Sequence, residues 1–357
     1  KLGEIATFSK GKGISKIDIE DNGKIECIRY GELYTHYKEV INEIKSFTNV
    51  NETDLIFSEI NDVIIPASGE SAVDIATASC VLKDKVALGG DLNIIKTNNN
   101  GIFLAYYLNN KKKLKIASLA QGVSVVHLYS SQLATLSLNL PKLNEQKKIS
   151  SFLALLDERI HTQTKIIEEL KLLKITLRYQ LYEQILNQEN EYVQIKDTLN
   201  YEQPTKYLVT NTDYSSDISL IPVLTANKAF VLGYTDEEFG IYDKGQCIIF
   251  DDFTMDIKFV NFPFKVKSSA IKILTAKPNV NLKFIFEYLS FLNLSSNEHK
   301  RHYISEIEPL KMQLPNCIQQ IYVADFLASI DDKIKTEFEI HTLLLKQKQY
   351  LLANLFI

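Results

Sequence analysis

Carboxylates and histidines are the first residues whose types and spacing suggest chemistry. Asp251, Asp252 and Asp256 follow a strand-like run. Such carboxylates could hold Mg²⁺, form a turn after the strand, or accept a hydrogen bond from a cytosine amino group in a DNA groove. His299 and His302 are the nearest approach to a histidine metal pair, but their spacing equally fits a polar surface pair. Neither group has the spacing of a recognised metal site, and we expect none.

A glycine-rich segment, Gly11-Lys12-Gly13-Ile14-Ser15-Lys16, is the closest match to a phosphate-binding loop. Its backbone N–H groups could contact phosphate, or it could be a flexible surface loop. The sequence contains no Gly-Lys-Ser/Thr of a nucleotide-binding loop, no adjoining prolines as an adenine methyltransferase motif requires, and no Pro-Asp of a nuclease motif. We therefore expect a non-catalytic protein that holds no cofactor.

The composition is that of an ordinary globular protein, with 45% hydrophobic and 24% charged residues in a chain of 357, enough for two or three domains. The formal charge of −4 argues against a protein that coats nucleic acid by bulk charge, although local basic patches stay possible.

The four cysteines form no CxxC pair, which favours reduced thiols in the cytoplasm over zinc or disulfides. No apolar run reaches the ~20 residues of a membrane span. The first residues have no signal-peptide shape and read as the approach to a strand, so we expect the natural protein to begin earlier.

The main signal in the sequence is an internal repeat at an offset of 174 residues. Residues 152–160 (Phe-Leu-Ala-Leu-Leu-Asp-Glu-Arg-Ile) and 326–334 (Phe-Leu-Ala-Ser-Ile-Asp-Asp-Lys-Ile) are identical at five of nine positions. Repetition at a fixed offset indicates a duplicated structural unit. The same offset relates Leu140-Pro141 to Leu314-Pro315 and Gln146 to Gln320.

Both repeats continue as long helices, because neither 144–186 nor 316–356 contains Gly or Pro. Apolar residues recur along each at 4,3 spacing, which is typical of a helix-pair interface. In the first helix they are Ile149, Leu153, Leu156, Ile160, Ile167, Leu170, Leu177 and Leu181, and in the second Val323, Leu327, Ile330, Ile334, Leu344, Leu351 and Leu355. Polar residues interrupt both seams at matching positions, Gln163 with Glu337 and Lys174 with Lys348. We expect the two helices, each roughly 60 Å long, to pair with each other; a coiled coil that only dimerises the protein is the alternative.

The segments in front of the helices are related more loosely. Residues 28–33 align with 221–226 at an offset of 193, and 63–65 align with 247–249 at an offset of 184. Short strands are expected at 92–95, 247–250 and 270–274, and helices at 102–108 and 282–292. The sequence thus predicts an α/β (α+β) domain over 1–141, a helix over 142–190, a second such domain over 191–315 and a helix over 316–357. The helices should form an antiparallel coiled coil within a pseudo-twofold repeat.

These motifs resemble those of a known family. A Leu-Pro with Gln five residues after the proline, then Phe-Leu-Ala-x-(Leu/Ile)-Asp-(Glu/Asp)-(Arg/Lys)-Ile and a long heptad helix, occurs twice. This is similar to the two conserved central regions of the specificity (S) subunits of type I restriction–modification systems. Residues 27–35 and 221–228 resemble two classes of their target-recognition domains, so the resemblance covers essentially the whole chain. A Trp that is common before Leu-Gly-(Asp/Glu)-Ile is absent here, which bears on where the natural chain begins.

The resemblance implies two target-recognition domains on an antiparallel helix pair, each domain reading one half of a bipartite DNA site while the helices set the unread spacer. The implied partners are double-stranded DNA, two modification (methyltransferase) subunits docked on the helices, and restriction subunits, acting in host defence in a bacterial or archaeal cytoplasm without a membrane. S-adenosylmethionine, ATP and Mg²⁺ would then belong to the partner subunits. Independently, rods of roughly 60 Å suit this task, because half-sites one DNA turn apart lie ~34 Å from each other.

Neither domain is basic overall, since 1–141 has 15 basic and 16 acidic residues and 191–315 has 13 basic and 16 acidic residues. Contacts to phosphates and bases are therefore expected from loops. In the first domain the expected residues are Lys10, Lys12, Lys16, Arg29, Tyr30, Ser68, Glu70, Ser71, Gln121 and Ser124. In the second they are Thr225, Asn227, Lys228, Lys267, Ser268, Ser269, His299, Lys300, Arg301 and His302. The basic run at 111–115 could contact phosphate or cap a helix that ends near Asn110.

Three functions remain to be separated. The first is a DNA-reading specificity subunit with catalytic partners. The second is an enzyme in its own right, for which no motif is present. The third is a coiled-coil interaction or scaffold protein without DNA specificity, in which every loop residue named above is simply a solvated side chain.

Overall fold

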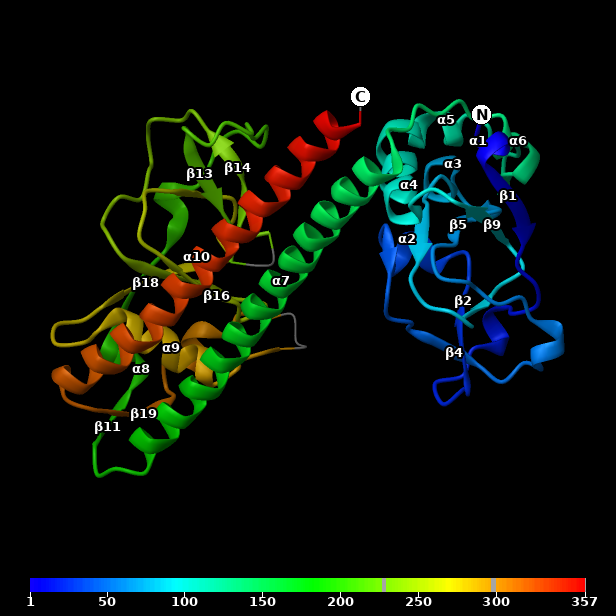
Figure 1. Cartoon of the computed structure of the whole chain (residues 1–357). Helices are drawn as coiled ribbons and strands as arrows, with labels where there is room; N and C mark the ends of the chain where they lie inside the picture. Colours follow the sequence, from blue (N-terminus) through cyan, green and yellow to red (C-terminus); the bar gives the residue numbers. More distant parts are fainter. Residues whose placement is uncertain (227–228, 297–299, 357) are drawn as a thin grey trace. The chain divides into compact units, whose positions relative to one another are not determined.

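The computed structural model describes residues 1–226, 229–296 and 300–356, and the chain divides into two compact units. Unit 1 contains Lys1–Thr164 and Ile340–Ile357, and unit 2 contains Lys165–Glu339. Two long helices, α7 (Leu143–Leu186) and α10 (Cys317–Leu355), each contribute part of their length to both units (Figure 1). The four-segment domain division expected from the sequence stays a prediction.

The centre of unit 1 is a five-stranded sheet in the order β1-β9-β5-β7-β3. Its strands are β1 (Ala6–Lys10), β9 (Leu92–Thr97), β5 (Val63–Pro66), β7 (Ser79–Val81) and β3 (Val40–Ile41). β5 is buried along its whole length, as are the first four residues of β9. Continuous apolar runs of this kind form strands that are covered on both faces. The strand expected at 92–95 is confirmed.

Smaller elements surround this sheet. They are a three-stranded sheet of β4 (Ser46–Thr48), β2 (Ile25–Ile28) and β8 (Ala87–Leu88), a ladder of β6 (Ser68–Gly69) with β10 (Val126–His127), and the helices α1 (Leu2–Ile5), α2 (Glu32–Thr35), α3 (Ala72–Ile75), α4 (Gly101–Tyr107), α5 (Lys113–Ala117) and α6 (Ser130–Ala134). The helix expected at 102–108 is therefore confirmed. It continues through a π-helical turn, Leu108–Lys112, into α5. The basic run at 111–115 therefore lies across the junction of the π-helical turn with α5, and both roles considered for it stay predictions.

Unit 2 contains a four-stranded sheet in the order β12-β18-β15-β16 and a three-stranded sheet in the order β14-β13-β17. Their strands are β12 (Leu199–Glu202), β18 (Ile271–Ala276), β15 (Cys247–Asp251), β16 (Ile257–Val260), β14 (Val231–Thr235), β13 (Ile221–Leu224) and β17 (Lys265–Val266). A two-stranded ladder of β11 (Glu191–Gln194) and β19 (Lys311–Leu314) and the helices α8 (Ile195–Thr198) and α9 (Leu282–Phe291) complete the unit. The strands expected near 247–250 and 270–274 and the helix at 282–292 are confirmed.

The long helices pack against each other within each unit. In unit 1, Leu156 and Ile160 of α7 form a buried cluster with Leu344 of α10. In unit 2, Tyr182 of α7 and Leu327 of α10 belong to one core that also includes α9. Early residues of one helix meet late residues of the other in both units, so the expected antiparallel packing is confirmed (Figure 1).

The seam positions named from the sequence lie on the covered side of the helices. Each of the fifteen apolar seam residues is buried or half-buried. The four polar interruptions are covered as well, although charged side chains avoid the interior unless they are paired. In both helices the lysine that interrupts the seam, Lys174 or Lys348, forms ion pairs.

The repeated Leu-Pro…Gln motif has the same structural role in both units. Gln146 Nε2 donates to the carbonyl oxygen of Pro141 at 2.8 Å, and its Oε1 accepts from the backbone N–H of Asn100 at 3.1 Å. Gln320 makes the same two bonds, to the equivalent proline carbonyl at 2.8 Å and to the N–H of Asn281 at 2.9 Å. Asn100 and Asn281 are the N-caps of α4 and α9. The glutamine thus ties the start of each long helix to the start of a helix of the adjoining domain.

Strand pairing shows how the two globular parts correspond, and it corrects two alignments. Val63 pairs with β9 at the position where Ile248 pairs with β18, so the offset between these equivalent residues is 185 rather than the 184 expected. Ile28 and Leu224 end equivalent parallel ladders, against β8 and β17, so their offset is 196 rather than 193. Short apolar strands match one another in several registers, and only the hydrogen-bond ladder selects one. In the described part of the chain, no helix combines the length and apolar character that crossing a bilayer requires.

Candidate nucleic-acid interface

Two of the loops expected to contact DNA meet in unit 1 at one short β-ladder. β6 pairs with β10, with Ser68 opposite His127. Gln121 exchanges two backbone hydrogen bonds with His127, at 2.9 and 2.7 Å, so the loop at 121–124 folds back beside the loop at 68–71. A Cβ at Gly69 would lie 2.4 Å from Ile75 Cγ2, and the close approach therefore needs glycine there. Gln121 and the rest of its loop are exposed, whereas Ser68 is buried.

An aromatic and cationic cluster follows the same ladder. The rings of His127 and Tyr129 stack with centroids 6.3 Å apart and 22° between their planes, and Lys10 Nζ lies 5.9 Å from the Tyr129 centroid. All three side chains are exposed, Tyr129 at 46%. Exposed aromatic faces beside a lysine can stack on bases while the ammonium contacts phosphate. We name Lys10, His127 and Tyr129 the stacking cluster; sequence reasoning found only Lys10 of it, and the signal for the others was their place directly after the 121–124 loop.

Tyr34 connects Arg29 and Tyr30 to the same ladder: it lies beside Gly69 of the ladder, and both residues affect its pKa. The Tyr34 hydroxyl would be 3.8 Å from a Cβ at Gly69. Burial, together with the nearby Tyr30 and Glu70, raises the pKa of Tyr34 above its ordinary value, while Arg29 opposes this shift. Arginine and polar side chains gathered on one edge suit the reading of base edges.

The other candidates of unit 1 occupy varied positions. Lys12 and Lys16 are exposed, and Lys12 Nζ lies 3.5 Å from an Asp54 carboxylate oxygen. Ser71 is the N-cap of α3, where its hydroxyl accepts from the backbone N–H of Asp74 at 3.1 Å. Lysines that are only loosely paired at the surface remain available to phosphate.

In unit 2 the candidate segments also converge, at the ends of two parallel strands. Thr225 follows β13 and Lys267 follows β17, and the N–H of Lys267 donates to the last carbonyl of β13 at 3.2 Å. Unit 1 repeats this bond between Gly89 and the end of β2, at 2.9 Å, so Arg29 takes the place that Thr225 has in unit 2. Lys267 is exposed and Thr225 is buried at 7%. The two units therefore present different side chains from equivalent backbone positions.

Asp252 is a buried post beneath these loops. It is 1% exposed, and its carboxylate accepts from the N–H groups of His302 at 3.1 Å and Tyr303 at 2.8 Å. Lys272 Nζ lies 3.4 Å from the other carboxylate oxygen of Asp252. The backbone N–H of Asp252 donates to the carbonyl of Ala270 at 3.0 Å. The post joins the segment after β17 to the segment that follows residue 300.

The acidic cluster forms a turn, one of the three interpretations of the sequence. Asp251 Oδ1 accepts from the N–H groups of Phe253 at 2.9 Å and Thr254 at 3.0 Å. Because Asp251 and Asp252 are both buried, reading of a cytosine by these two carboxylates is wrong. Among the described residues, no group of three or more histidine, cysteine and carboxylate side chains could hold a metal ion.

The remaining candidates of unit 2 differ in accessibility. Asn227, Lys228 and His299 lie outside the described residues. Lys300 and Arg301 are exposed, and Lys300 pairs with Glu306 at 2.9 Å. His302 is buried with Nδ1 2.9 Å from the same carboxylate. Ser269 is exposed, and Ser268 is half-buried with its hydroxyl accepting from the N–H of Ala270.

A second buried ion pair supports the three-stranded sheet of unit 2. Lys265 is fully buried, and its Nζ lies 2.6 Å from Glu237 Oε2 and donates to the Phe239 carbonyl at 2.6 Å. Glu237 Oε1 accepts from the N–H groups of Thr210 at 2.9 Å and Asn211 at 3.0 Å. The hydrogen bond from Lys265, followed by that from the Thr210 hydroxyl, lowers the pKa of Glu237 to about 2. The carboxylate thus fixes the loop before β13 to the end of β14.

Comparison with known proteins gives a consistent family. Residues 1–172 match the family described as type I restriction modification DNA specificity domain. The chain is similar to the Escherichia coli EcoR124I/EcoR124II specificity subunit, with 45% identity over 133 residues, which are 36% of this chain and 33% of that relative. It is also similar to the putative MjaX specificity subunit of Methanocaldococcus jannaschii, with 24% identity over 373 residues, covering 94% of this chain and 82% of that relative. The match to the E. coli subunit thus spans about a third of that protein's length.

Solved structures agree in fold. The S subunit of the type I restriction–modification system from M. genitalium superposes with a TM-score of 0.70 at 16% identity, covering 100% of this chain and 95% of the other. A chain from a structural study of type I complex assembly and conformational transition gives a TM-score of 0.56 at 13% identity, covering 100% and 96%. Two α/β domains with paired long helices are therefore an established architecture. The first 172 residues thus match the type I restriction modification DNA specificity domain, and the whole chain shares the fold of solved specificity subunits.

Proposed function

We propose that this chain reads DNA for a type I restriction–modification complex, with each unit contacting one half of a bipartite site. The observation that carries the proposal is the equivalence of the two parallel ladders: at their ends, unit 1 has Arg29 and Gly89 where unit 2 has the buried Thr225 and the exposed Lys267. Unlike side chains at equivalent positions would read unlike half-sites. Within unit 1, the stacking cluster and Arg29 are the favoured contacts; within unit 2, they are Lys267, Ser269, Lys300 and Arg301.

Catalysis is assigned to partner subunits under this proposal. Two modification subunits would bring S-adenosylmethionine and dock on the long helices, and restriction subunits would bring ATP and Mg²⁺ chemistry. Exposed apolar side chains on α7 and α10 support docking, because such patches mark interaction surfaces. They include a pair at the repeat offset, Phe152 at 47% and Phe326 at 37% exposure. The complex would act in the cytoplasm, where the DNA of a bacterium or archaeon lies.

The test uses the full chain with and without modification subunits encoded beside it. The complex should transfer labelled methyl groups from S-adenosylmethionine to a defined bipartite DNA site, and the chain alone should transfer none. Robust transfer by the chain alone would show an enzyme instead. Failure both to co-purify with a methyltransferase and to bind any specific duplex would favour a coiled-coil scaffold.

A domain exchange tests the assignment of half-sites. Replacement of residues 1–141 by the corresponding domain of another specificity subunit should change one half of the methylated site and leave the other half unchanged. Methylome sequencing of cells that carry the complex measures both halves at once. A change in both halves would contradict the proposal that each unit reads separately.

A further inference from the structure

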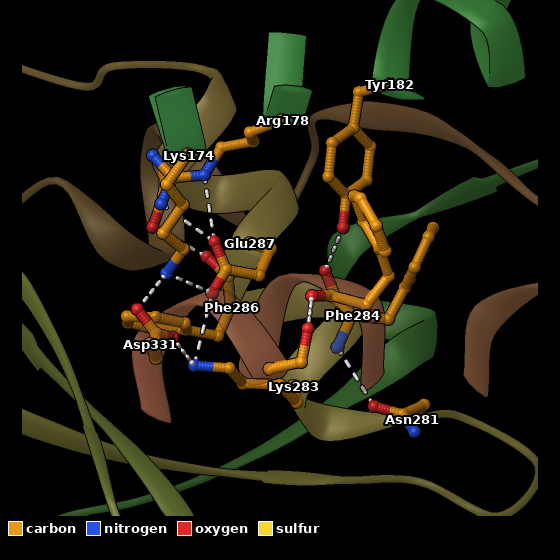
Figure 2. Close-up of polar contacts among 12 residues, drawn as sticks. Lys174, Arg178, Tyr182, Asn281, Lys283, Phe284, Phe286, Glu287 and Asp331 are labelled. Carbon is orange, nitrogen blue, oxygen red and sulfur yellow. Dashed lines mark hydrogen bonds and ion pairs between the residues drawn. The ribbon is translucent and has the colours of Figure 1, made fainter. Parts of the chain in front are cut away.

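In unit 2, the joint between the recognition domain and the long helices is charged (Figure 2). We name it mount 2 and define it by Lys174, Arg178 and Tyr182 of α7, Asp331 of α10, and Lys283, Phe284 and Glu287 of α9. Glu287 is 0% exposed, and its carboxylate accepts from Lys174 Nζ at 2.9 Å and from Arg178 Nε at 2.8 Å. Removal of one partner from such a buried pair is strongly destabilising, because the remaining charge is uncompensated.

The network of mount 2 continues across to α10. Lys174 Nζ also lies 2.6 Å from Asp331 Oδ1. Lys283 Nζ lies 2.9 Å from the other Asp331 oxygen and 3.1 Å from Glu287 Oε1 (Figure 2). Three cations and two carboxylates thus join α7, α9 and α10, and Tyr182 adds a hydrogen bond to the Phe284 carbonyl at 2.6 Å.

Unit 1 contains the equivalent joint, built from the same repeat positions. We name it mount 1. It is defined by Lys348 and Leu352 of α10, Phe356 directly after α10, Asp157 of α7, and Ile102, Phe103 and Tyr106 of α4. On the long helices the two mounts are related by the offset of 174. On the domain helices the offset is 181, as it is for their N-caps Asn100 and Asn281.

Part of the joint is common to both mounts. Lys348 Nζ lies 2.6 Å from Asp157 Oδ1, as Lys174 does from Asp331, so the lysine and the aspartate exchange helices between the two mounts. The ring of Phe356 packs on Phe103 at 5.5 Å, as Tyr182 packs on its phenylalanine at 5.2 Å. These shared contacts attach either domain helix in the same way.

Four positions differ between the mounts: Tyr182 is replaced by Phe356, which keeps the ring without the hydroxyl, and three further positions differ in charge. Where mount 2 has Arg178, Lys283 and Glu287, mount 1 has Leu352, Ile102 and Tyr106. Tyr106 donates its hydroxyl hydrogen to Asp157 and brings no charge. Leu352 and Ile102 pack, half-buried, on the apolar cluster around Phe103. Mount 2 thus has two cations and a carboxylate where mount 1 has two aliphatic side chains and a tyrosine.

A mismatch would leave a buried group without its partner. On mount 1, Glu287 would face Leu352 and lose the arginine that binds one of its oxygens. On mount 2, Tyr106 would leave the guanidinium of Arg178, whose side chain is 16% exposed, without a carboxylate. Ordinary apolar packing offers no such discrimination, because cores tolerate changes of shape far better than unpaired charges.

We propose that these three positions form an address that restricts each recognition domain to its own end of the helix pair. Arg178 with Glu287 and Lys283 encodes one address, and Leu352 with Tyr106 and Ile102 encodes the other. The six are positioning residues, since they act by holding the domain helix rather than by touching DNA. The inference rests on the proposed function where it is tested by the methylation rate. The test by unfolding temperature does not depend on the proposed function.

The first test rewrites mount 2 as mount 1 in the full chain. Arg178→Leu should leave the buried Oε2 of Glu287 without its donor, while Lys174 and Lys283 still contact Oε1. Glu287→Tyr should leave Arg178 without a carboxylate, so each variant should lower the rate of site-specific methylation at least about tenfold and lower the unfolding temperature. The triple variant Arg178→Leu/Lys283→Ile/Glu287→Tyr should recover the rate to within about threefold of wild type. Gln180→Leu, at an exposed position of the same helix, is the matched control and should change neither quantity.

The outcomes separate the address from the proposed function. A triple variant no better than the worse single variant would overturn the address, and so would harmless single variants. If the wild-type complex shows no sequence-specific methylation, the proposed function fails, and recovery of the unfolding temperature in the triple variant still decides the address.

The second test moves a whole domain. A chimera with residues 191–315 in place of 1–141 carries the second domain twice and should methylate a site with two copies of the second half-site. It should do so at least about tenfold faster with Leu352→Arg than without it, because the arginine restores the partner of Glu287. Leu352→Met is the uncharged control. Equal rates for the chimeras with and without Leu352→Arg would overturn the address.

Discussion

At the scale of single residues, buried charges fix the loops that this protein presents to solvent. Asp252 holds the segment after residue 300 through two backbone N–H groups, and Glu237 holds residues 210 and 211 in the same manner. For Glu237, the hydrogen bonds and the facing Lys265 stabilise the charged form of the carboxylate. Such posts keep a loop in one conformation without contributing to the reading surface itself.

The pKa of Glu237 predicts an acid-sensitive unit 2. Its value of about 2 lies below the ordinary 4.5, so the carboxylate stabilises the fold fully above pH 4.5, and this contribution is lost as the pH falls from 4.5 toward 2. Glu237→Gln should destabilise the protein by about 1–3 kcal/mol at pH 7. Urea unfolding at pH 7, 5 and 3 should show the difference from wild type shrinking at pH 3, and a constant difference would refute the assignment.

The stacking cluster predicts a change confined to one half-site. Tyr129→Ala removes the ring that lies between Lys10 and His127, and should slow methylation of the cognate site about 5- to 150-fold, the cost of one lost base stack of about 1–3 kcal/mol. Steady-state methylation of duplexes that are mutated in either half of the site measures how much the variant slows the reaction. Discrimination at the half read by unit 2 should be unchanged, which makes that half the internal control; a loss at both halves would argue for misfolding.

At the scale of elements, the long helices are joined to the globular domains by a repeated amide clasp. Gln146 and Gln320 each accept from the N–H of a capping asparagine, a donor that a helix start leaves without an intrahelical partner, and each donates to a proline carbonyl. The clasp explains why the repeat preserves a Leu-Pro and a glutamine at fixed separation. Rigid attachment of a recognition domain to its helix is what a reading subunit requires.

Loss of the clasp should therefore weaken the joint. Gln146→Ala leaves the Pro141 carbonyl and the Asn100 N–H without these bonds and should cost about 1–3 kcal/mol of unfolding free energy. Gln180→Ala, on an exposed face of the same helix, should cost less than about 0.5 kcal/mol. Thermal unfolding of the two variants side by side tests this. Equal stabilities would show that the hydrogen bonds of Gln146 do not stabilise the joint.

At the scale of the whole molecule, α7 is one uninterrupted helix that contributes to both units, with the antiparallel α10 packed along it in each. A helix changes length in fixed steps of ~1.5 Å per residue. If the helices set the unread spacer, a change in their length should appear as a change in base pairs.

A paired insertion tests this proposed ruler. Seven residues added to α7 near Gln163 and seven to α10 near Glu337 lengthen each helix by ~10.5 Å, which equals about three base pairs at ~3.4 Å each. The recognised spacer should grow by that amount while both half-sites stay the same. Methylome sequencing would expose the opposite result, altered half-sites with an unchanged spacer.

The sequence by itself determined the helices, the duplication and the absence of recognisable catalytic motifs. Helix periodicity is local, because residues three and four apart share a face wherever the chain is helical, so the seam could be read residue by residue. The repeat of Asp157 at Asp331 and Lys174 at Lys348 was visible too, although nothing in the sequence said that they pair crosswise.

Only the tertiary structure decided which loops converge. Ser68 meets His127, and Thr225 meets Lys267, through ladders between strands far apart in sequence, whose register a single chain does not reveal. For the same reason the sequence left three interpretations open for Asp252, which the structure shows as a buried post. Burial and pairing depend on what the rest of the chain places around a residue, and this is why the helices could be predicted while the contacts among the loops could not.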